Sequence, residues 1–198
     1  MVDTKKVTKR GRPRGFDRQE AISRARALFH RRGYEGVGIA DLSDALGVNP
    51  PSLYAAFGSK AGLFEATVED YLRQEGGFIP ATLKRDDPPE MLVPALFEEA
   101  VRQFTRNSEP LGCMVIMHGD AGRDEAVRTL SAEIGANTRR TITARFETNL
   151  GERAEALADT IYVALSGLST AARSGVPAER LGPVARLMAA SIVAAFFG

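Results

Sequence analysis

Apolar residues recur at helical spacing along most of the chain. The first helix is expected after Asp17, which can cap it with Glu20 three residues on, and Gly33 can end it. The pattern predicts further helices at residues 39–47, 50–57, 60–74, 90–106, 124–150, 152–175 and 178–198. Because no strand pattern stands out, we expect an all-α fold.

Residues 39–57 hold two short predicted helices joined by a tight turn that contains a glycine. Asn49 can cap the second helix, and Pro50 occupies its first position, where a missing N–H has no cost. Leu53 and Phe57 lie four residues apart and can hold this short helix to a core. The arrangement is that of a helix-turn-helix, with the second helix able to enter a major groove.

The remaining segments carry weaker signals. Residues 76–90 read as a loop or a broken stretch, and residues 112–122 as a short apolar helix or a buried turn. Pro94 predicts a kink or a late helix start, and Gly135 weakens a long amphipathic helix. His30, near the end of the first helix, is expected to be a surface or capping residue.

The net charge of +1 conceals an uneven distribution. Residues 1–32 contain 11 lysines or arginines and 3 acidic residues, a balance of +8, whereas the rest of the chain has a balance of −7. Residues 1–15 lack periodicity and read as a flexible basic arm. Such an arm suits a polyanion, although a solubilising tail would have the same composition.

Several classes of protein are disfavoured by the composition. The single cysteine, Cys113, cannot form an internal disulfide, and with two histidines in the chain we expect no metal site and no cofactor. The longest apolar run, residues 187–197, is shorter than the ~20 residues of a membrane span. No targeting signal is visible, so we expect a cytoplasmic protein. No catalytic constellation is visible, so we expect that the protein is not an enzyme.

The motifs "GYEG", "DLSDALGV", "SLYAAF" and "SKAGLF" within residues 11–64 resemble the DNA-binding domain of the TetR family of bacterial transcriptional regulators. Residues 65–198 resemble the family only in being helical with two long helices at the end. The resemblance implies a homodimer on a palindromic double-stranded operator. It also implies a basic arm (1–15), a three-helix DNA-binding domain (16–60) and a larger helical domain for ligand binding and dimerisation (61–198).

Part of the DNA contact is expected from the residues themselves. The Tyr54 hydroxyl suits a phosphate oxygen, and Lys60 with the free N–H groups of its helix forms a second anion site. The family carries Thr or Ser where this chain has Gly38, and polar side chains where it has Ala55. Few direct hydrogen bonds to base edges are therefore expected. We therefore expect the arm to supply much of the affinity. The candidate DNA-binding residues are Arg12, Arg14, Gly38, Asn49, Pro50, Pro51, Ser52, Tyr54, Ala55 and Lys60.

The resemblance also implies a small, largely apolar or aromatic effector whose identity is unknown. The candidate ligand-binding residues are Phe97, Phe104, Cys113, Met114, Met117, His118, Phe146 and Tyr162. Methionine and phenylalanine at helical spacing are more often core residues, which remains the alternative for this set. The expected function is a repressor that a ligand releases from its operator. A DNA-binding architectural protein without ligand control is the second possibility.

Overall fold

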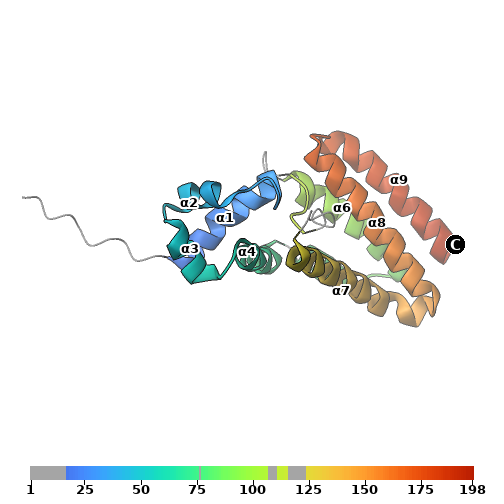
Figure 1. The fold of residues 1–198 in the computed structure, drawn as a ribbon. Helices are drawn as coiled ribbons and strands as arrows, with labels where there is room; N and C mark the ends of the chain where they lie inside the picture. Colours follow the sequence, from blue (N-terminus) through green and yellow to red (C-terminus); the bar gives the residue numbers. More distant parts are fainter. Residues whose placement is uncertain (1–16, 76, 107–110, 116–123) are drawn as a thin grey trace, which may run out of the picture.

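The computed structural model describes residues 17–75, 77–106, 111–115 and 124–198, and within them the chain forms helices and no strand. The all-α expectation is confirmed. We call α1, α2, α3 and the N-terminal half of α4 the head, and the remaining helices the body (Figure 1). The helices are α1 (Arg18–Arg32), α2 (Ile39–Leu46), α3 (Pro50–Phe57), α4 (Lys60–Gln74), α5 (Phe78–Leu83), α6 (Pro89–Thr105), α7 (Glu125–Leu150), α8 (Arg153–Arg173) and α9 (Ala178–Phe197).

The helices of the head begin where their capping side chains predict. The carboxylate of Asp17 accepts hydrogen bonds from the first turn of α1, and the side-chain oxygen of Asn49 accepts one from Ser52 N at 2.9 Å. Ser59 caps α4 in the same way. Glu20 does not return the capping bond to Asp17 and instead pairs with Arg24 on the surface of α1.

The turn between α2 and α3 depends on Gly47. This residue adopts the left-handed conformation, with φ 67° and ψ 30°, which a side chain would disfavour. Its N–H and that of Val48 satisfy carbonyl groups in the last turn of α2. The tight reversal joins α2 to α3 as the helix-turn-helix pattern predicts.

An aromatic cluster fills the core of the head. The ring of Phe29 in α1 lies edge-on to Phe64 of α4, with ring centroids 5.2 Å apart. The ring centroids of Tyr34 and Phe64 lie 5.1 Å apart. Leu42 of α2 and Leu53 of α3 are fully buried beside them. Because Phe64 belongs to this core, the expected boundary at residue 60 falls in the first turn of a helix that the head and the body share.

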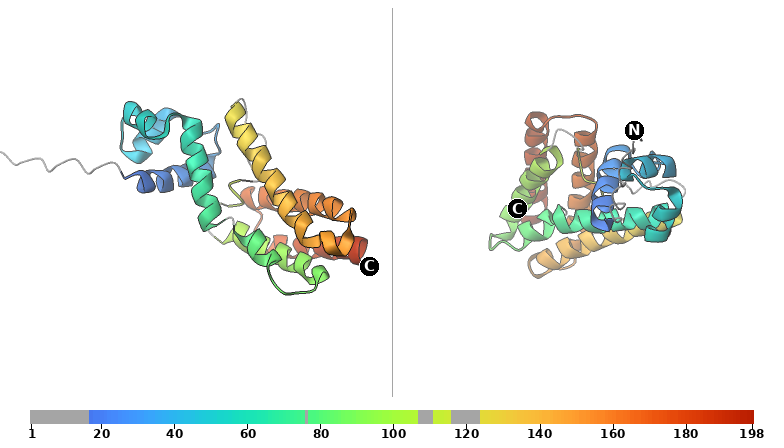
Figure 2. Two further views of the ribbon diagram at one scale, coloured as in Figure 1. Left: turned by 90° about the horizontal axis from the view of Figure 1, so that it is seen from below. Right: turned by 90° about the vertical axis from the view of Figure 1, so that its left-hand side faces the viewer.

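The body is a bundle of long helices around a second set of buried side chains. Figure 2 shows α4 running from the head to the body, where α6, α7, α8 and α9 pack together. Its core includes Leu92, Leu96, Phe97, Phe104, Met114, Ile142, Phe146, Leu157, Ile161 and Leu165.

The structure differs from the sequence predictions in parts of the body. The stretch expected to be a loop contains α5, which buries Phe78 and Ile79 against its neighbours. Helix α6 starts before Pro94 and continues through it. Gly135 lies inside α7, where a Cβ atom would come within 2.8 Å of the hydroxyl of Tyr162, so the missing side chain makes room for that ring.

The last two helices, α8 and α9, carry exposed apolar side chains. Val163 of α8 is 69% exposed, and Leu187 of α9 is 70% exposed. By length and composition alone α9 could cross a membrane, and 22% of its most apolar window is buried in the body. The longest apolar run in the sequence, residues 187–197, is only part of this helix, which begins at Ala178.

Candidate nucleic-acid interface and adjoining hollow

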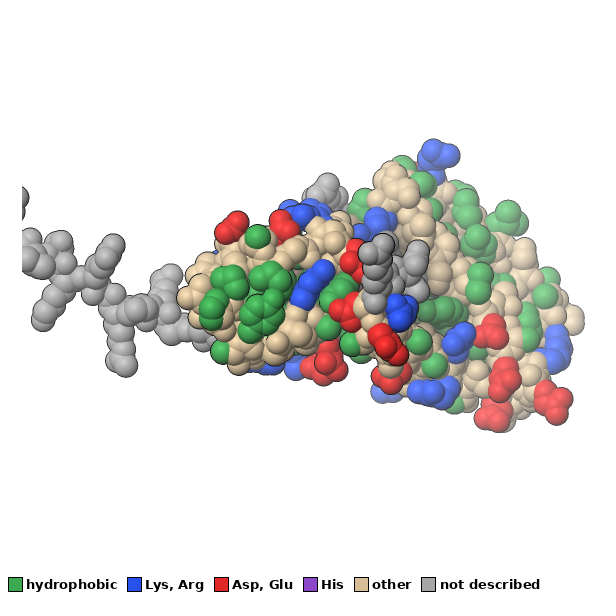
Figure 3. All heavy atoms as spheres, viewed as in Figure 1, with side chains coloured by type: hydrophobic (Ala, Val, Ile, Leu, Met, Phe, Trp, Pro, Cys, Tyr) green, Lys and Arg blue, Asp and Glu red, His purple; other side chains and the backbone are tan. Residues whose placement is uncertain are grey.

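The outer face of α3 is small and open to solvent. Pro51, Ser52 and Ala55 are exposed, and Tyr54 is 46% exposed, whereas Leu53 is fully buried. Figure 3 shows hydrophobic side chains with few charges at the end of the head that holds α2 and α3 in Figure 1. The helix thus presents the residues that the sequence predicted, and its short side chains allow close approach to a groove.

Lys60 is the first basic residue after Arg32, so the segment that holds α2 and α3 has no cation of its own. The ammonium nitrogen of Lys60 lies 3.9 Å from the centroid of the Tyr34 ring, which is a cation–π contact. Burial lowers the pKa of Lys60, while the carboxylates of Glu35 and Asp124 act in the opposite direction. The expected phosphate anchor is thus held on the head beside the first turn of α4.

A second cation near α3 was not assigned a role from the sequence. The guanidinium carbon of Arg18 lies 5.1 Å from the centroid of the Phe57 ring, next to the last turn of α3. Arg18 is exposed and occupies the first position of α1. Its place directly after the basic arm is the only signal in the sequence that could have indicated it.

Gly38 is the N-cap residue of α2, as expected, and is exposed. Its N–H donates to the carboxylate of Asp41 at 2.7 Å. Arg32 donates to the same carboxylate at 2.8 Å, and these bonds lower the pKa of Asp41. Arg12 and Arg14, the predicted contacts from the arm, lie outside the described residues.

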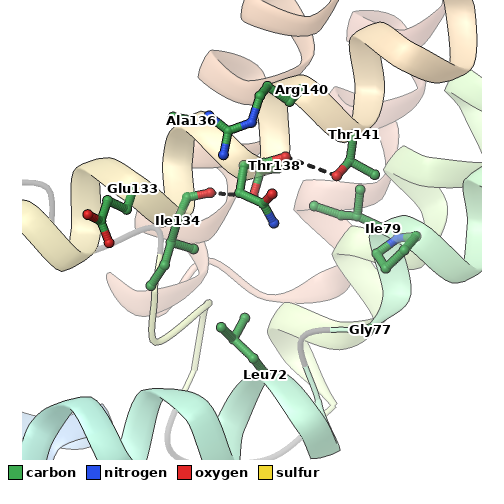
Figure 4. Close-up of a pocket in the computed structure, with 11 residues that line it drawn as sticks. Leu72, Gly77, Ile79, Glu133, Ile134, Ala136, Thr138, Arg140 and Thr141 are labelled. Carbon is green, nitrogen blue, oxygen red and sulfur yellow. Dashed lines mark hydrogen bonds between the residues drawn. The ribbon is translucent and has the colours of Figure 1, made fainter.

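A hollow of about 740 Å³ lies between α4, α5 and the middle of α7. In Figure 4, Leu72 from α4 and Ile134 from α7 point into it from opposite sides, and Ile79 lines it from α5. Polar side chains on α7, including Thr138 and Arg140, also line it. The volume is in the range of sites for small molecules.

A smaller chamber of about 40 Å³ adjoins this hollow and shares Leu72, Ile79, Ile134 and Thr138 with it. Its other walls are Tyr71, Phe78, Cys113, Val115, Gly135 and Tyr162. We call this chamber the inner end of the hollow. Burial raises the pKa of Tyr71 and of Tyr162, so both hydroxyls are neutral at physiological pH. The described residues that line the inner end include no Asp, Glu, Lys, Arg or His.

The predicted ligand-binding residues divide into three groups. Cys113 and Tyr162 line the inner end of the hollow. Phe97, Phe104, Met114 and Phe146 are buried in the core and line neither the hollow nor its inner end, so the hollow does not support their predicted role. Met117 and His118 lie outside the described residues.

His30 is buried and is not the surface or capping residue that the sequence suggested. Its Nε2 lies 3.1 Å from the carbonyl oxygen of Gly112, which can only accept, so Nε2 carries the proton. Burial lowers the pKa of His30 from 6.5 to about 4, against the opposing effect of that hydrogen bond. The missed contact spans 82 residues of chain, and no local pattern indicates it.

The chain is similar to known bacterial regulators along most of its length. The family pattern TetR_N, described as "Bacterial regulatory proteins, tetR family", matches residues 21–67. The HTH-type transcriptional repressor BdcR of Escherichia coli (strain K12) is 40% identical over 195 residues, with 97% of each chain covered. The HTH-type transcriptional repressor ComR of the same organism is 32% identical over 194 residues, with 89% of each covered. Both are named as repressors and neither as an enzyme.

Solved structures show the same fold. A cysteine mutant of the TetR family transcriptional regulator CifR, complexed with 26 bp double-strand operator DNA, is 36% identical with a TM-score of 0.83. The similarity covers 91% of this chain and 99% of that one. A TetR transcriptional regulator from Chloroflexus aurantiacus J-10-FL is 22% identical with a TM-score of 0.73, over 88% of this chain and 93% of that one.

Proposed function

The chain belongs to the TetR family of bacterial regulatory proteins, and from that premise we propose that it is a cytoplasmic transcriptional repressor. It binds a palindromic operator as a homodimer, and a small molecule in the hollow between α4, α5 and α7 releases it. It is not an enzyme. The observation that carries the proposal is the exposed outer face of α3 next to Lys60, in a chain similar over nearly its whole length to named repressors.

DNA binding rests on the geometry around α3. Asn49 and Pro50 begin the helix, and its exposed residues, Pro51, Ser52 and Ala55, face the major groove. The three side chains offer a hydroxyl and apolar contacts, which suit thymine methyl groups more than donor–acceptor readout. The similar CifR mutant, whose structure is a complex with 26 bp double-strand operator DNA, supports the proposal that this chain binds operator DNA.

Most of the affinity comes from backbone contacts. Tyr54 and Lys60 bind phosphates on either side of α3, with Gly38 at the N-terminus of α2 as a further point of approach. Arg12 and Arg14 of the arm add phosphate or minor-groove contacts. Deletion of residues 1–14 should therefore weaken operator binding and reduce its salt dependence, which a titration at several salt concentrations measures. An unchanged affinity and slope would remove the arm from the proposal.

Dimerisation takes place through α8 and α9. Val163, Val184 and Leu187 are exposed apolar residues on these two helices, and a second copy of the chain would cover them. A two-fold dimer also matches a palindrome, whose half-sites lie roughly 34 Å or a multiple of it apart. The exposed face of α9 thus has an explanation that requires no membrane.

The effector is a small, largely apolar molecule. It binds better to the form of the dimer whose heads do not fit the operator, so that its binding shifts the population toward that form. The hollow supports this part of the proposal because a DNA-binding architectural protein has no need of such a cavity. That alternative predicts weak preference among DNA sequences and no release by small molecules.

The DNA contacts can be tested with Tyr54→Phe, Lys60→Ala and the double variant. We expect the double variant to bind the selected operator roughly 10-fold more weakly at moderate salt, with a salt slope smaller by about 1 for each head. Lys84→Ala, an exposed lysine of the body, is the control and should bind as the parent does. Equal binding by the parent and the double variant at every salt concentration would refute the proposed interface.

A further inference from the structure

Two adjacent residues of the turn at residues 111–115 have different partners in the two parts of the molecule. The carbonyl oxygen of Gly112 accepts the hydrogen bond from His30 of α1, in the head. The side chain of Cys113 lines the inner end of the hollow, in the body. Because consecutive Cα atoms are about 3.8 Å apart, Cys113 cannot be displaced far without moving Gly112.

The turn is fixed to the body by backbone hydrogen bonds. The N–H of Gly112 donates to the carbonyl of Phe104 at 2.9 Å, and the N–H of Cys113 donates to the hydroxyl of Ser169 at 2.8 Å. Gly112 has φ +77°, and a Cβ atom there would lie 2.7 Å from the backbone oxygen of Ser169. The turn therefore has little freedom to absorb a local displacement, and a pushed Cys113 shifts it as a unit.

Tyr71 connects the same residues from α4. Its hydroxyl donates to the thiol of Cys113 at 3.5 Å, and its ring lies edge-on to His30 with centroids 5.6 Å apart. Tyr71 also lines the inner end of the hollow. His30, Tyr71 and Cys113 thus form one buried cluster between the hollow and the head.

We infer that the Gly112–Cys113 turn transmits occupation of the hollow to the head. A small, neutral, mostly apolar molecule at the inner end displaces Cys113, the Gly112 carbonyl moves away from His30, and α1 is released together with α3. His30 is a positioning residue in this scheme and does not contact the effector. The inference rests on the proposed function, and it adds the chemistry of the occupant and the route of coupling.

The occupant's chemistry follows from the walls of the inner end. Phe78, Val115 and Ile134 offer apolar surface, and the hydroxyls of Tyr71 and Tyr162 offer hydrogen bonds. Among the described residues that line this chamber there is no Asp, Glu, Lys, Arg or His, so an ion would lose its hydration without an oppositely charged partner among them. A neutral molecule with one polar group fits these walls.

A second contact between head and body lies farther from the chamber. The hydroxyl of Tyr34 donates to the carboxylate of Asp124, the N-cap residue of α7. The first residue of α7 that lines the inner end is Ile134, about 15 Å along the helix axis. This contact stays in place and provides the point about which the released head turns.

The test uses substitutions that fill the hollow from opposite walls, because the effector is unidentified. Leu72→Trp places an indole in the hollow from α4, and Thr138→Phe places a ring there from α7. The chain has no tryptophan, so the fluorescence of the introduced indole reports whether it is shielded from water. Each filler is combined with His30→Phe, which removes the hydrogen bond, and with His30→Gln, whose amide can donate from nearly the same place.

We expect each filler to weaken operator binding at least fivefold in the parent and in the His30→Gln background. In the His30→Phe background, whose own affinity is already lower, the fillers should change binding by less than twofold, since the link is broken. Such non-additivity indicates coupling, because independent sites would add. Fillers that act equally in all three backgrounds, or in none while the indole is shielded, would overturn the inference.

Amide hydrogen exchange separates this inference from the proposed function. The fillers should speed exchange in the last turn of α1, residues 29–33, in the parent but not add to the rate in His30→Phe. This readout needs no DNA, so it holds even if the protein binds no operator. Unchanged exchange in the filled parent would refute the coupling while leaving DNA binding intact.

Discussion

Three of the four helices of the head begin on capping side chains, whereas most described helices of the body begin without one. Asp17, Asn49 and Ser59 each accept hydrogen bonds from the first turn of a helix in the head. Among the helices that the structure describes in the body, α7 has such a cap, from Asp124, and α5, α6, α8 and α9 lack a side-chain cap bond. The head is thus specified largely by local signals, and the body by contacts between distant segments.

How much a cap contributes to stability depends on the length of its helix. Helices α2 and α3 have 8 residues each, too short to be stable alone, so their ends must be well defined. Helices α6 to α9 have 17 to 26 residues, and their buried faces contribute far more than any cap. Substitutions that remove packing and substitutions that remove caps should therefore act with different strength in the two parts.

The largest expected effect is the loss of a core side chain in the body. Phe97 of α6 is fully buried, and Phe97→Ala removes its ring and leaves a cavity. We expect the free energy of unfolding to fall by about 3–5 kcal/mol in urea titrations. Met91→Ala on the same helix is the control, because Met91 is 56% exposed and should cost less than about 0.5 kcal/mol. A loss below about 1 kcal/mol for Phe97→Ala would contradict the view that packing specifies the body.

Acid sensitivity tests the contact that joins the two parts. The pKa of His30 is about 4 in the folded protein and 6.5 ordinarily, so between these values the unfolded chain binds more protons. The free energy of unfolding should therefore decrease as pH falls from 6.5, by about 2–3 kcal/mol at pH 4, and this contribution is fully present above pH 6.5.

The control for this prediction is His30→Gln, which has no titrating group at the same place. Carboxylates also titrate in acid, so the informative quantity is the difference between the parent and the variant. The parent should lose stability more steeply than the variant between pH 6.5 and 4. Parallel pH profiles for the two proteins would show that His30 titrates alike in the folded and unfolded states.

The sequence predicted the head more completely than the body because the signals that specify the head are local. Caps, glycine turns and spacing in the head are local, so the bounds of α3 and the exposed face with Pro51 and Tyr54 could be predicted. Helix α5 was missed because its six residues are held by burial against other helices. The hydrophobic pattern of residues 78–83 alone does not indicate which helices they pack against.

The hollow was predicted only in part. Phe97 and Phe146 are of a residue type that is common in ligand-binding sites, but phenylalanine is equally common in hydrophobic cores. In this structure both side chains are buried in the core. Leu72, Ile134 and Thr138 line the hollow because of how α4 and α7 are placed, which depends on the whole bundle. The contact of His30 with Gly112 likewise follows from tertiary packing alone.

Removal of a cap should have a moderate effect, and it should be confined to the head. Asn49→Ala removes the acceptor for Ser52 N, and we expect a loss of about 1 kcal/mol in the free energy of unfolding. Glu152→Ala at the N-cap of α8 is the matched control, since Glu152 makes no side-chain cap bond. We expect a change within about 0.5 kcal/mol there. Equal losses at the two caps would remove the contrast between head and body.

The smallest expected effect is a gain at the start of α2. Gly38 has φ −91° and ψ 169°, which any residue can adopt, and it lacks the side-chain cap that the other helices of the head possess. Gly38→Ser supplies a hydroxyl that can accept from the first turn, and we expect a gain of a few tenths of a kcal/mol. The new Cβ would lie 3.2 Å from a carboxylate oxygen of Asp41, which must shift slightly.

Gly38→Ala separates the hydroxyl from the added carbon. Alanine introduces the same crowding without an acceptor, so it should be less stable than both the serine variant and the parent. The serine variant should also bind operator DNA somewhat more tightly, because its hydroxyl lies at the exposed N-terminus of a helix, where phosphates bind. Thermal melts and operator titrations of the three proteins measure both effects. A serine variant no more stable than the alanine variant would show that Asp41 already satisfies the first turn, and that the head gains nothing from a fourth cap.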